Sequence, residues 1–454
     1  MAINNLPASI QSVIQLNYLE RAFEEALRAK LGFRSIADRE PFMAGIGETI
    51  TKTRTGLLPA VTTALSPAAN TDITSGLTAQ NYPVEQYSLA INQYAGNMQL
   101  NLATAQVAIA DLYLRNGVTL AEQAFRSVDT LAQKTLYNTY LGGNTRVTAT
   151  LGAPAATIAV DDIRGFQYTW NSAGQVVPIS VSNPVNVTVG ADVYSLTGST
   201  ADGTNVSTAP GGISGTLTFA TNVTVSDGTL GNAVVSAVAP YVVRPSTTSG
   251  NTMASTTAGI SSANDLNAGR LTMQMILDAK SEMGSNGVMP VDDSGMYHLY
   301  LNPRQAKGLF ADQEFQLLFR GTEFKSEEYR RGIVADILGV QMIETNLNPV
   351  QALSGVGTIQ RAMLVGQGAL VEGTFTNTAY AAAEKADDDD GMITVVDGIA
   401  HVTREPLDAL KQVVTQSWSY IGGFAVPSDI TTNPNTIPSA SNSAFKRGIM
   451  LESL

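Results

Sequence analysis

Residues 296–305, MYHLYLNPRQ, have the pattern of a strand that runs directly into a helix. Side chains alternate between the two faces of a strand, so His298 and Tyr300 share one face and the leucines the other. Asn302 is a favoured N-cap, and Pro303 suits the first helical position because an N–H has no helical partner there. The stretch therefore predicts a strand that ends at Asn302 and a helix that begins at Pro303.

His298 is one of two histidines in the chain, and the other is His401. A catalytic imidazole needs a nucleophile or a carboxylate within hydrogen-bond reach, whereas the strand face of His298 offers a thioether and a phenol. His401 lies beside alanine and valine in GIAHVTREP. Both histidines are therefore predicted to be structural. Because the chain has no cysteine, it also has no thiolate nucleophile, no disulfide and no cysteine-ligated metal site.

Three further motifs fail as sites for metals or phosphates. In ADDDDGMITVVD (386–397), an EF-hand register would put Ala386 at the first ligand position and Asp397 at the twelfth, so a solvated acidic loop is predicted. The fragments GIGET (45–49) and GQG (366–368) lack the remaining residues of a phosphate loop and are predicted to be turns. Sequons, which matter only in a secreted protein, are at Asn186, Asn205 and Asn222. No catalytic, cofactor-binding or metal-binding residue is therefore predicted.

The composition favours a protein that buries its surface against copies of itself. Only 15% of the 454 residues are charged, against roughly 25% in an ordinary soluble domain. An uncharged polar surface costs little to desolvate, because no ion leaves water. The net charge of −12 argues against sequence-specific binding of nucleic acid, which depends on Lys and Arg, although a wall can enclose nucleic acid without gripping it. Neither a signal peptide nor a membrane-spanning run is expected, so synthesis in a cytoplasm is predicted.

The first third of the chain predicts two helices and an extended arm. Residues 16–31 have the apolar spacing of a short amphipathic helix, with Gly32 as its C-cap. Residues 45–101 are two Thr-rich flanks around a polar, turn-prone middle, which predicts a long two-stranded arm. Such a hairpin is only marginally stable by itself in water, so it should lie on another surface. Residues 118–141 carry the strongest helical stripe, with a break or bend near Gly117.

The middle of the chain predicts an inserted β module over residues 147–257. Short Val/Thr strands alternate there with turn sequences, and NVTV occurs at 186–189 and again at 222–225, which is typical of a small sandwich or barrel. A helix over 269–283 and two late strands, 393–402 and 410–427, follow. In the last strand, a single face is predicted for Val414, Gln416, Trp418 and Tyr420.

Two stretches, 296–316 and 329–349, carry a family resemblance. In 296–316, a strand runs into a helix that starts at Asn-Pro. In 329–349, a Gly-Ile stretch leads to Gly-Val, a strand and a turn. A return strand over 85–102 also leads toward the long helix at 120–145. Together they resemble the major capsid proteins of tailed double-stranded DNA bacteriophages, which share the Hong Kong 97-type fold. Two departures are the inserted β module and the absence of a long acidic helical prodomain, which favours a separate scaffolding protein.

The resemblance implies an α+β fold with six parts. These are an N-terminal arm (1–44), an extended β-hairpin loop (45–101), the spine helix of the peripheral domain (102–146), an inserted all-β domain (147–257), an axial domain with its connections (258–350), and the remaining axial and peripheral strands (351–454).

The resemblance also implies a structural, non-catalytic protein without cofactors. Copies would form hexamers and pentamers of an icosahedral virion capsid, assembled in the bacterial host cytoplasm, that encloses double-stranded DNA without sequence-specific binding and without a membrane. Its partners would be itself and scaffolding, portal and decoration proteins. Two alternatives stay open: a secreted or surface adhesion protein whose 147–257 module binds, and an enzyme with an unrecognised Ser or Asp site. The size of the purified particles distinguishes a capsid protein from both alternatives.

Overall fold

The computed structural model is an α+β structure with two compact units. Unit 1 comprises residues 1–50, 88–136 and 370–426, and unit 2 comprises 51–87, 137–369 and 427–454. The structure describes residues 32–41, 49–55, 60, 62, 84–101, 109–171, 176–245, 252–253, 269–291, 295–321, 338–353, 357–374, 393–404, 409–410, 412–427, 430–432, 435–437 and 446–454. The amphipathic helix expected at 16–31 lies outside these residues.

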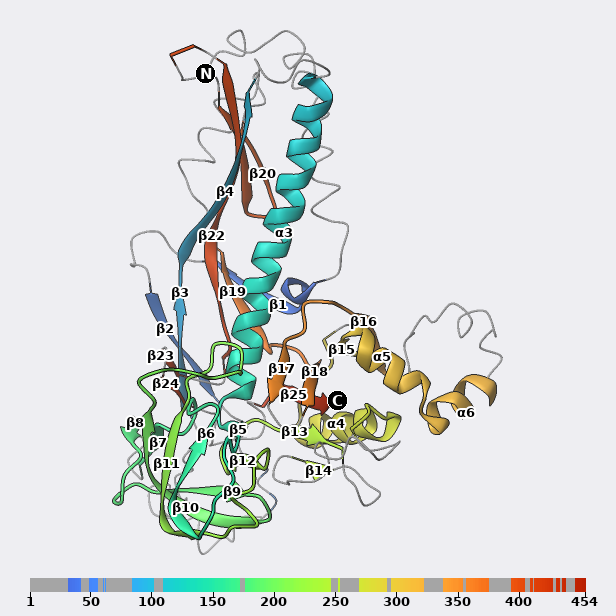
Figure 1. The fold of residues 1–454 in the computed structure, drawn as a ribbon. Helices are drawn as coiled ribbons and strands as arrows, with labels where there is room; N and C mark the ends of the chain where they lie inside the picture. Colours follow the sequence, from blue (N-terminus) through green and yellow to red (C-terminus); the bar gives the residue numbers. More distant parts are fainter. Residues whose placement is uncertain are drawn as a thin grey trace, which may run out of the picture. The chain divides into compact units, whose positions relative to one another are not determined.

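Unit 1 is built on a long helix, α3 (Ile109–Leu141), and a six-stranded sheet (Figure 1). The strand order is β1-β19-β22-β21-β20, and β4 also pairs with β22. Alanines of α3 pack with Trp418 and Tyr420 of β22, so the predicted stripe and the predicted buried strand face form one core. The strands are β1 (Ala37–Pro41), β4 (Asn92–Asn101), β19 (Leu370–Thr374), β20 (Ile393–Val396), β21 (Ile399–Arg404) and β22 (Val413–Ala425).

Two expectations for this region are wrong. Helix α3 runs through Gly117 without a break, because a single helical glycine costs only about 1 kcal/mol and the buried stripe on both sides outweighs it. The extended loop is also shorter than 45–101. Its described strands, β2 (Thr49–Thr55) and β3 (Val84–Ala90), form a two-stranded sheet, whereas β4 pairs along its length with β22. Residues 63–83 of the loop lie outside the described part.

A closed antiparallel β-barrel occupies residues 144–236 of unit 2. Its strand order is β5-β12-β9-β10-β11-β6, and a bridge between Val147 and Val160 joins the last strand back to the first. Backbone bonds from Thr148 N to Ala159 O (3.0 Å) and from Asp161 N to Arg146 O (3.1 Å) complete the closure. The strands are β5 (Asn144–Arg146), β6 (Ala155–Val160), β9 (Val185–Val189), β10 (Asp192–Ala201), β11 (Gly215–Val223) and β12 (Ala233–Ser236).

The barrel has its own core and a narrower span than the predicted module. Valines and leucines of alternate strand positions fill it, with Phe166 and Phe219 among them. The predicted limits of 147 and 257 shift because β5 begins at Asn144 and β13 (Val242–Arg244) pairs with β25 of a different sheet. A separate ribbon is formed by β7 (Tyr168–Trp170) and β8 (Val176–Pro178), and another by β23 (Ile430–Thr432) and β24 (Asn435–Ile437).

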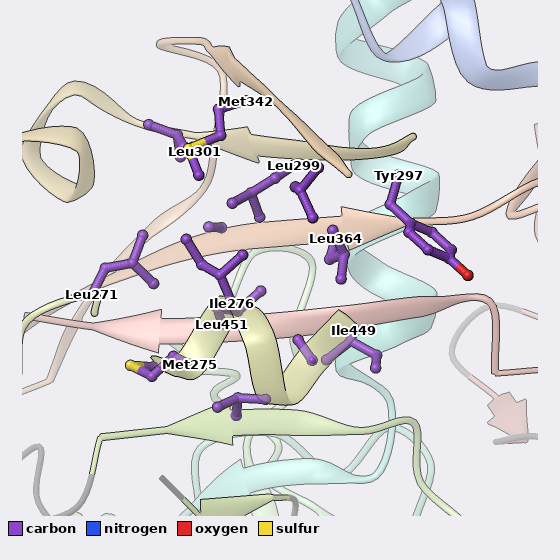
Figure 2. Close-up of a cluster of buried hydrophobic side chains, with 14 of the residues drawn as sticks. Leu271, Met275, Ile276, Tyr297, Leu299, Leu301, Met342, Leu364, Ile449 and Leu451 are labelled. Carbon is purple, nitrogen blue, oxygen red and sulfur yellow. The ribbon is translucent and has the colours of Figure 1, made fainter. Parts of the chain in front are cut away.

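The second sheet of unit 2 contains the opening sequence stretch. The strand order is β14-β13-β25-β18-β15-β16, and β17 pairs with β18. Figure 2 shows α4 (Met273–Ser285) against this sheet, with its Met275 and Ile276 facing leucines of the strands. The strands are β14 (Thr252–Met253), β15 (Tyr297–Leu301), β16 (Val340–Glu344), β17 (Val350–Leu353), β18 (Gly357–Val365) and β25 (Gly448–Ser453).

The predicted helix start after β15 is confirmed. The Asn302 side chain accepts a bond from Gln305 N (2.9 Å), and the Gln305 side chain accepts one from Asn302 N. This reciprocal capping box begins α5 (Pro303–Phe310), and α6 (Gln313–Gly321) follows. The strand is buried on both faces, and Asn302 and Gln305 are buried too, whereas Pro303 and Arg304 are exposed.

Candidate functional site

Both histidines lie in buried strands, and their structural role stays a prediction. His298 is in the middle of β15 and is 6% exposed, while His401 is in β21 and is 2% exposed. Burial lowers the pKa of His401 to about 4, so this imidazole is neutral near pH 7. Among the described residues, no group of three His, Asp or Glu side chains is placed to hold a metal ion.

The other sequence motifs are also occupied by structural contacts where the structure describes them. In the 366–368 turn, Gly366 N donates to Arg447 O and Gln367 N to Met289 O, so neither N–H is directed at a phosphate. Asp397 is the first residue of a two-residue turn between β20 and β21, with φ +53°. The acidic residues 387–390 lie outside the described part, as does most of GIGET.

Asp397, itself 41% exposed, belongs to a partly buried ion cluster of unit 1 that the sequence did not reveal. Arg34 donates to Glu372 (2.7 Å) and to Asp397 (3.0 Å), and Arg39 also bonds Asp397 (2.5 Å). Glu372 is fully buried and also accepts a bond from Tyr420 Oη (2.8 Å). Burial alone would lower the pKa of Arg34, but its bonds to Glu372 raise it overall. The cluster ties the segment after residue 31 to β19 and β22.

Close packing at Gly32 supports this anchor. The carboxylate of Asp129 on α3 accepts a bond from Arg34 N (3.0 Å), and a Cβ on Gly32 would lie 2.3 Å from the same carboxylate oxygen. Burial raises the pKa of Asp129 above its ordinary value, while its backbone bonds oppose the rise. Gly32 is therefore required by a close approach in the described structure.

An open groove between α3 and β4, here called the spine groove, is a candidate binding surface of unit 1. Its volume is about 860 Å³, and its lining includes Met98, Gln123, Arg126, Lys134 and Trp418. The Trp418 indole donates to Gln123 Oε1 (3.1 Å). The groove offers amides, hydroxyls and charges of both signs around an aromatic base, which suits binding of a polar chain segment.

Space for the Trp418 indole in the spine groove depends on a glycine. Gly96 of β4 pairs with Trp418 of β22, and a Cβ on Gly96 would lie 2.6 Å from the indole nitrogen. The glycine in YAGNM therefore leaves room for the indole and for its bond to Gln123.

In unit 2, a second ion cluster lies where the barrel meets the β13-β25-β18 sheet. Glu452 of β25 is 2% exposed and bonds Arg146 (2.5 Å), Arg244 (3.0 Å) and Arg361 (3.2 Å). Burial alone would raise the pKa of Glu452, but the three arginines hold it well below its ordinary value. The cluster joins strand β5 of the barrel to β13, β18 and β25.

His401 gives a testable pH dependence. Above pH 6.5 the imidazole is neutral in both folded and unfolded chains; between pH 6.5 and about 4 only the unfolded chain gains the proton. The free energy of unfolding should therefore fall by on the order of 3 kcal/mol across this window because of His401 alone. Urea unfolding of His401→Gln should show a shallower decline than wild type between pH 6.5 and 5. Parallel pH profiles of the two proteins would contradict the prediction. The difference between their free energies of unfolding at pH 8 measures the packing that the variant loses.

Comparison with known proteins gives structural similarity only. No family model matches the chain, and no curated protein does. Nearly all similar solved structures are capsids of tailed phages. The capsid of Ralstonia phage GP4 is 13% identical with TM-score 0.44, over 92% of this chain and 87% of that one. The capsid of cyanophage P-SCSP1u is 11% identical with TM-score 0.44, over 93% of this chain and 88% of that one. A chain of Mycobacterium phage Che8 is 11% identical with TM-score 0.41, over 93% of this chain and 91% of that one.

The first two are phage capsids, the class of protein that residues 296–316 and 329–349 resemble. The TM-scores are below 0.5, so these structures carry no argument about the function of this chain. Among the described residues, no helix is long and apolar enough to cross a lipid bilayer.

Proposed function

We propose that this chain is the major capsid protein of a tailed double-stranded DNA bacteriophage. The observation that carries the proposal is the β2–β3 ribbon, whose two described strands form a sheet only with each other. A two-stranded ribbon is marginally stable in water, so it gains stability by lying on another surface. In a shell, that surface is a neighbouring copy of the same chain.

The spine groove is the proposed receiving surface for the loop of a neighbouring copy. Between residues 56 and 83 the loop sequence has one charged residue, Asp72, among amides, hydroxyls and small apolar side chains. Such a segment can enter a groove without taking many ions out of water. The groove presents matching polar partners along α3, including Gln123, Arg126 and Lys134.

The proposed mechanism is self-assembly without catalysis. Each contact between copies is weak, but a subunit held at several sites is held more strongly than any one contact allows. The copies form hexamers and pentamers of an icosahedral shell around packaged double-stranded DNA. Scaffolding, portal and decoration proteins are the other partners. Assembly takes place in the cytoplasm of the bacterial host, and the protein ends in the virion capsid.

Electron microscopy of the purified full-length chain, expressed with and without a scaffolding protein, tests the proposal. Closed icosahedral particles are the expected result, with the 144–236 barrel on the outer surface of each subunit. A chain that stays monomeric under both conditions, yet binds cells or other surfaces, would instead favour the adhesion function. Turnover of a substrate by the monomer would favour the enzyme.

A further inference from the structure

Four polar side chains meet in unit 2 where the barrel adjoins β17 and β18. Asp161 directly follows β6, and Thr208 lies in the loop between β10 and β11. Gln351 belongs to β17 and Arg361 to β18, with which β17 pairs. Asp161, Gln351 and Arg361 are 3%, 3% and 4% exposed, whereas Thr208 lies at the surface. The barrel thus supplies a hydroxyl and a carboxylate, and the second sheet supplies an amide and a guanidinium.

The hydroxyl of Thr208 is placed as a nucleophile. It donates to Asp161 Oδ2 (3.1 Å), so a base lies within reach of its proton. The backbone N–H groups of Thr208 (2.9 Å) and Ala209 (3.0 Å) also donate to the Asp161 carboxylate and hold the loop against it. A hydroxyl beside a carboxylate base is an arrangement that activates threonine for attack on an acyl carbon.

The Gln351 amide has the orientation of an acyl donor. Its Nε2 donates to Thr208 Oγ1 (3.0 Å) and to Asp161 Oδ2 (2.6 Å), so the amide nitrogen lies beside both the hydroxyl and the acid. Its Oε1 accepts a bond from Arg361 Nη2. A cation at this oxygen stabilises the negative charge that develops there when a nucleophile attacks Cδ.

Arg361 is held in place and has a donor to spare. Its Nε donates to Glu452 (3.2 Å), whereas its buried Nη1 has no hydrogen-bond partner among the described residues. A negative oxygen on Gln351 would bind this guanidinium more strongly than the neutral amide oxygen does. A cavity of about 10 Å³, the size of one water molecule, is lined by Asp161, Gln351 and Arg361 and has room for a departing ammonia.

We propose that Thr208 and Gln351 form an intramolecular ester cross-link between the barrel and β17. Asp161 takes the hydroxyl proton while Oγ1 bonds Cδ, which gives a tetrahedral intermediate with its negative charge on Oε1. The Cδ–Nε2 bond then breaks, and its electron pair stays on the nitrogen, which takes the proton from Asp161 and leaves as ammonia. One hydroxyl and one amide become one ester and one ammonia, without an oxidant or a further reactant. Protonation and dilution of the ammonia pull the exchange toward the ester, and the cross-link does not depend on the proposed function.

The mass of the denatured full-length chain tests the cross-link. The chain should be lighter than its sequence by one ammonia, about 17 Da. Trypsin should release residues 165–270 and 332–361 as one joined species, because the single internal arginine of the two segments, Arg244, is followed by proline, which blocks cleavage. Hydroxylamine, which cleaves esters but not ordinary amides, should then separate the two peptides.

Three results would overturn the proposal. An unchanged mass with two separate peptides would mean that the four side chains make only a hydrogen-bonded contact. A gain of about 1 Da on the 332–361 peptide would mean that water, and not Thr208, attacks the amide. A loss of about 17 Da confined to a single peptide would place the lost ammonia in a cyclic imide rather than in a cross-link.

Variants identify the reacting groups. Thr208→Val removes the hydroxyl at nearly constant size and should abolish the joined species, whereas Thr208→Ser should retain it. Asp161→Asn should slow its formation in newly made chain by about 100-fold or more. Thr204→Val is the matched control in the same loop, where the Thr204 hydroxyl bonds Asp202 (3.0 Å), and it should cross-link fully. Urea unfolding checks that each variant is folded, and a joined species that persists in Thr208→Val would refute the site.

Discussion

Replacing Glu452 with glutamine is expected to lower the free energy of unfolding by about 3–5 kcal/mol. The substitution keeps the shape of the side chain but removes the carboxylate that bonds Arg146, Arg244 and Arg361. Three buried cations would then lose the carboxylate that they share.

Urea unfolding of full-length wild type and variant measures this loss. Glu344→Gln is the matched control, because Glu344 is an exposed residue of β16 in the same sheet, and its change should be within about 0.5 kcal/mol. If the free energy of unfolding of Glu452→Gln is within about 1 kcal/mol of that of the control, the arginines do not need the carboxylate.

The same cluster sets a pH range. The pKa of Glu452 is depressed in the folded chain, so its stabilising effect is complete above the pKa of an unfolded glutamate, about 4.5, and is lost as pH falls toward the folded value. Near pH 7 the wild-type cluster is therefore intact, and Glu452→Gln should lack this acid-dependent part of the unfolding profile.

Predictions from the sequence succeed where the signal lies within a few residues. Asn302 and Pro303 are adjacent, and together they specify the start of α5. The alternation through Gln416 and Trp418 likewise predicted the buried face of β22. A glycine such as Gly117 is a weaker signal, because packing along the whole of α3 decides whether the helix continues.

The buried charge clusters could not be predicted, because their members are far apart in the chain. Arg34 and Glu372 are 338 positions apart, and Arg146 and Glu452 are 306 apart. A single charge within an apolar strand, as in GIMLES or LVEGT, does indicate a buried ion pair. The strand itself does not name the partner, which depends on how the sheets assemble. For the same reason, β4 was assigned to the loop, since nothing local reveals its pairing with β22.

The largest expected effect on assembly comes from deleting residues 66–82, the tip of the extended loop. The subunit should fold, because the deleted stretch is mostly small and polar and has too little apolar surface to build a core. Stable shells should not form, because the loop is the proposed clamp between neighbouring copies and the contacts of a shell act together. Negative-stain microscopy and sedimentation give the shell yield, and circular dichroism with urea unfolding checks the subunit.

Blocking the receiving surface should have the same effect without shortening the chain. Arg126 of α3 is exposed and lines the spine groove, so Arg126→Trp should obstruct the groove and prevent shell formation. Arg115→Trp is the matched control at an exposed position of the same helix outside the lining, and its shells should form normally. If the loop deletion and the groove block both left shell yield unchanged, the loop would not act as a clamp in this groove. If only the deletion mattered, the loop would bind a different surface of the neighbouring copy.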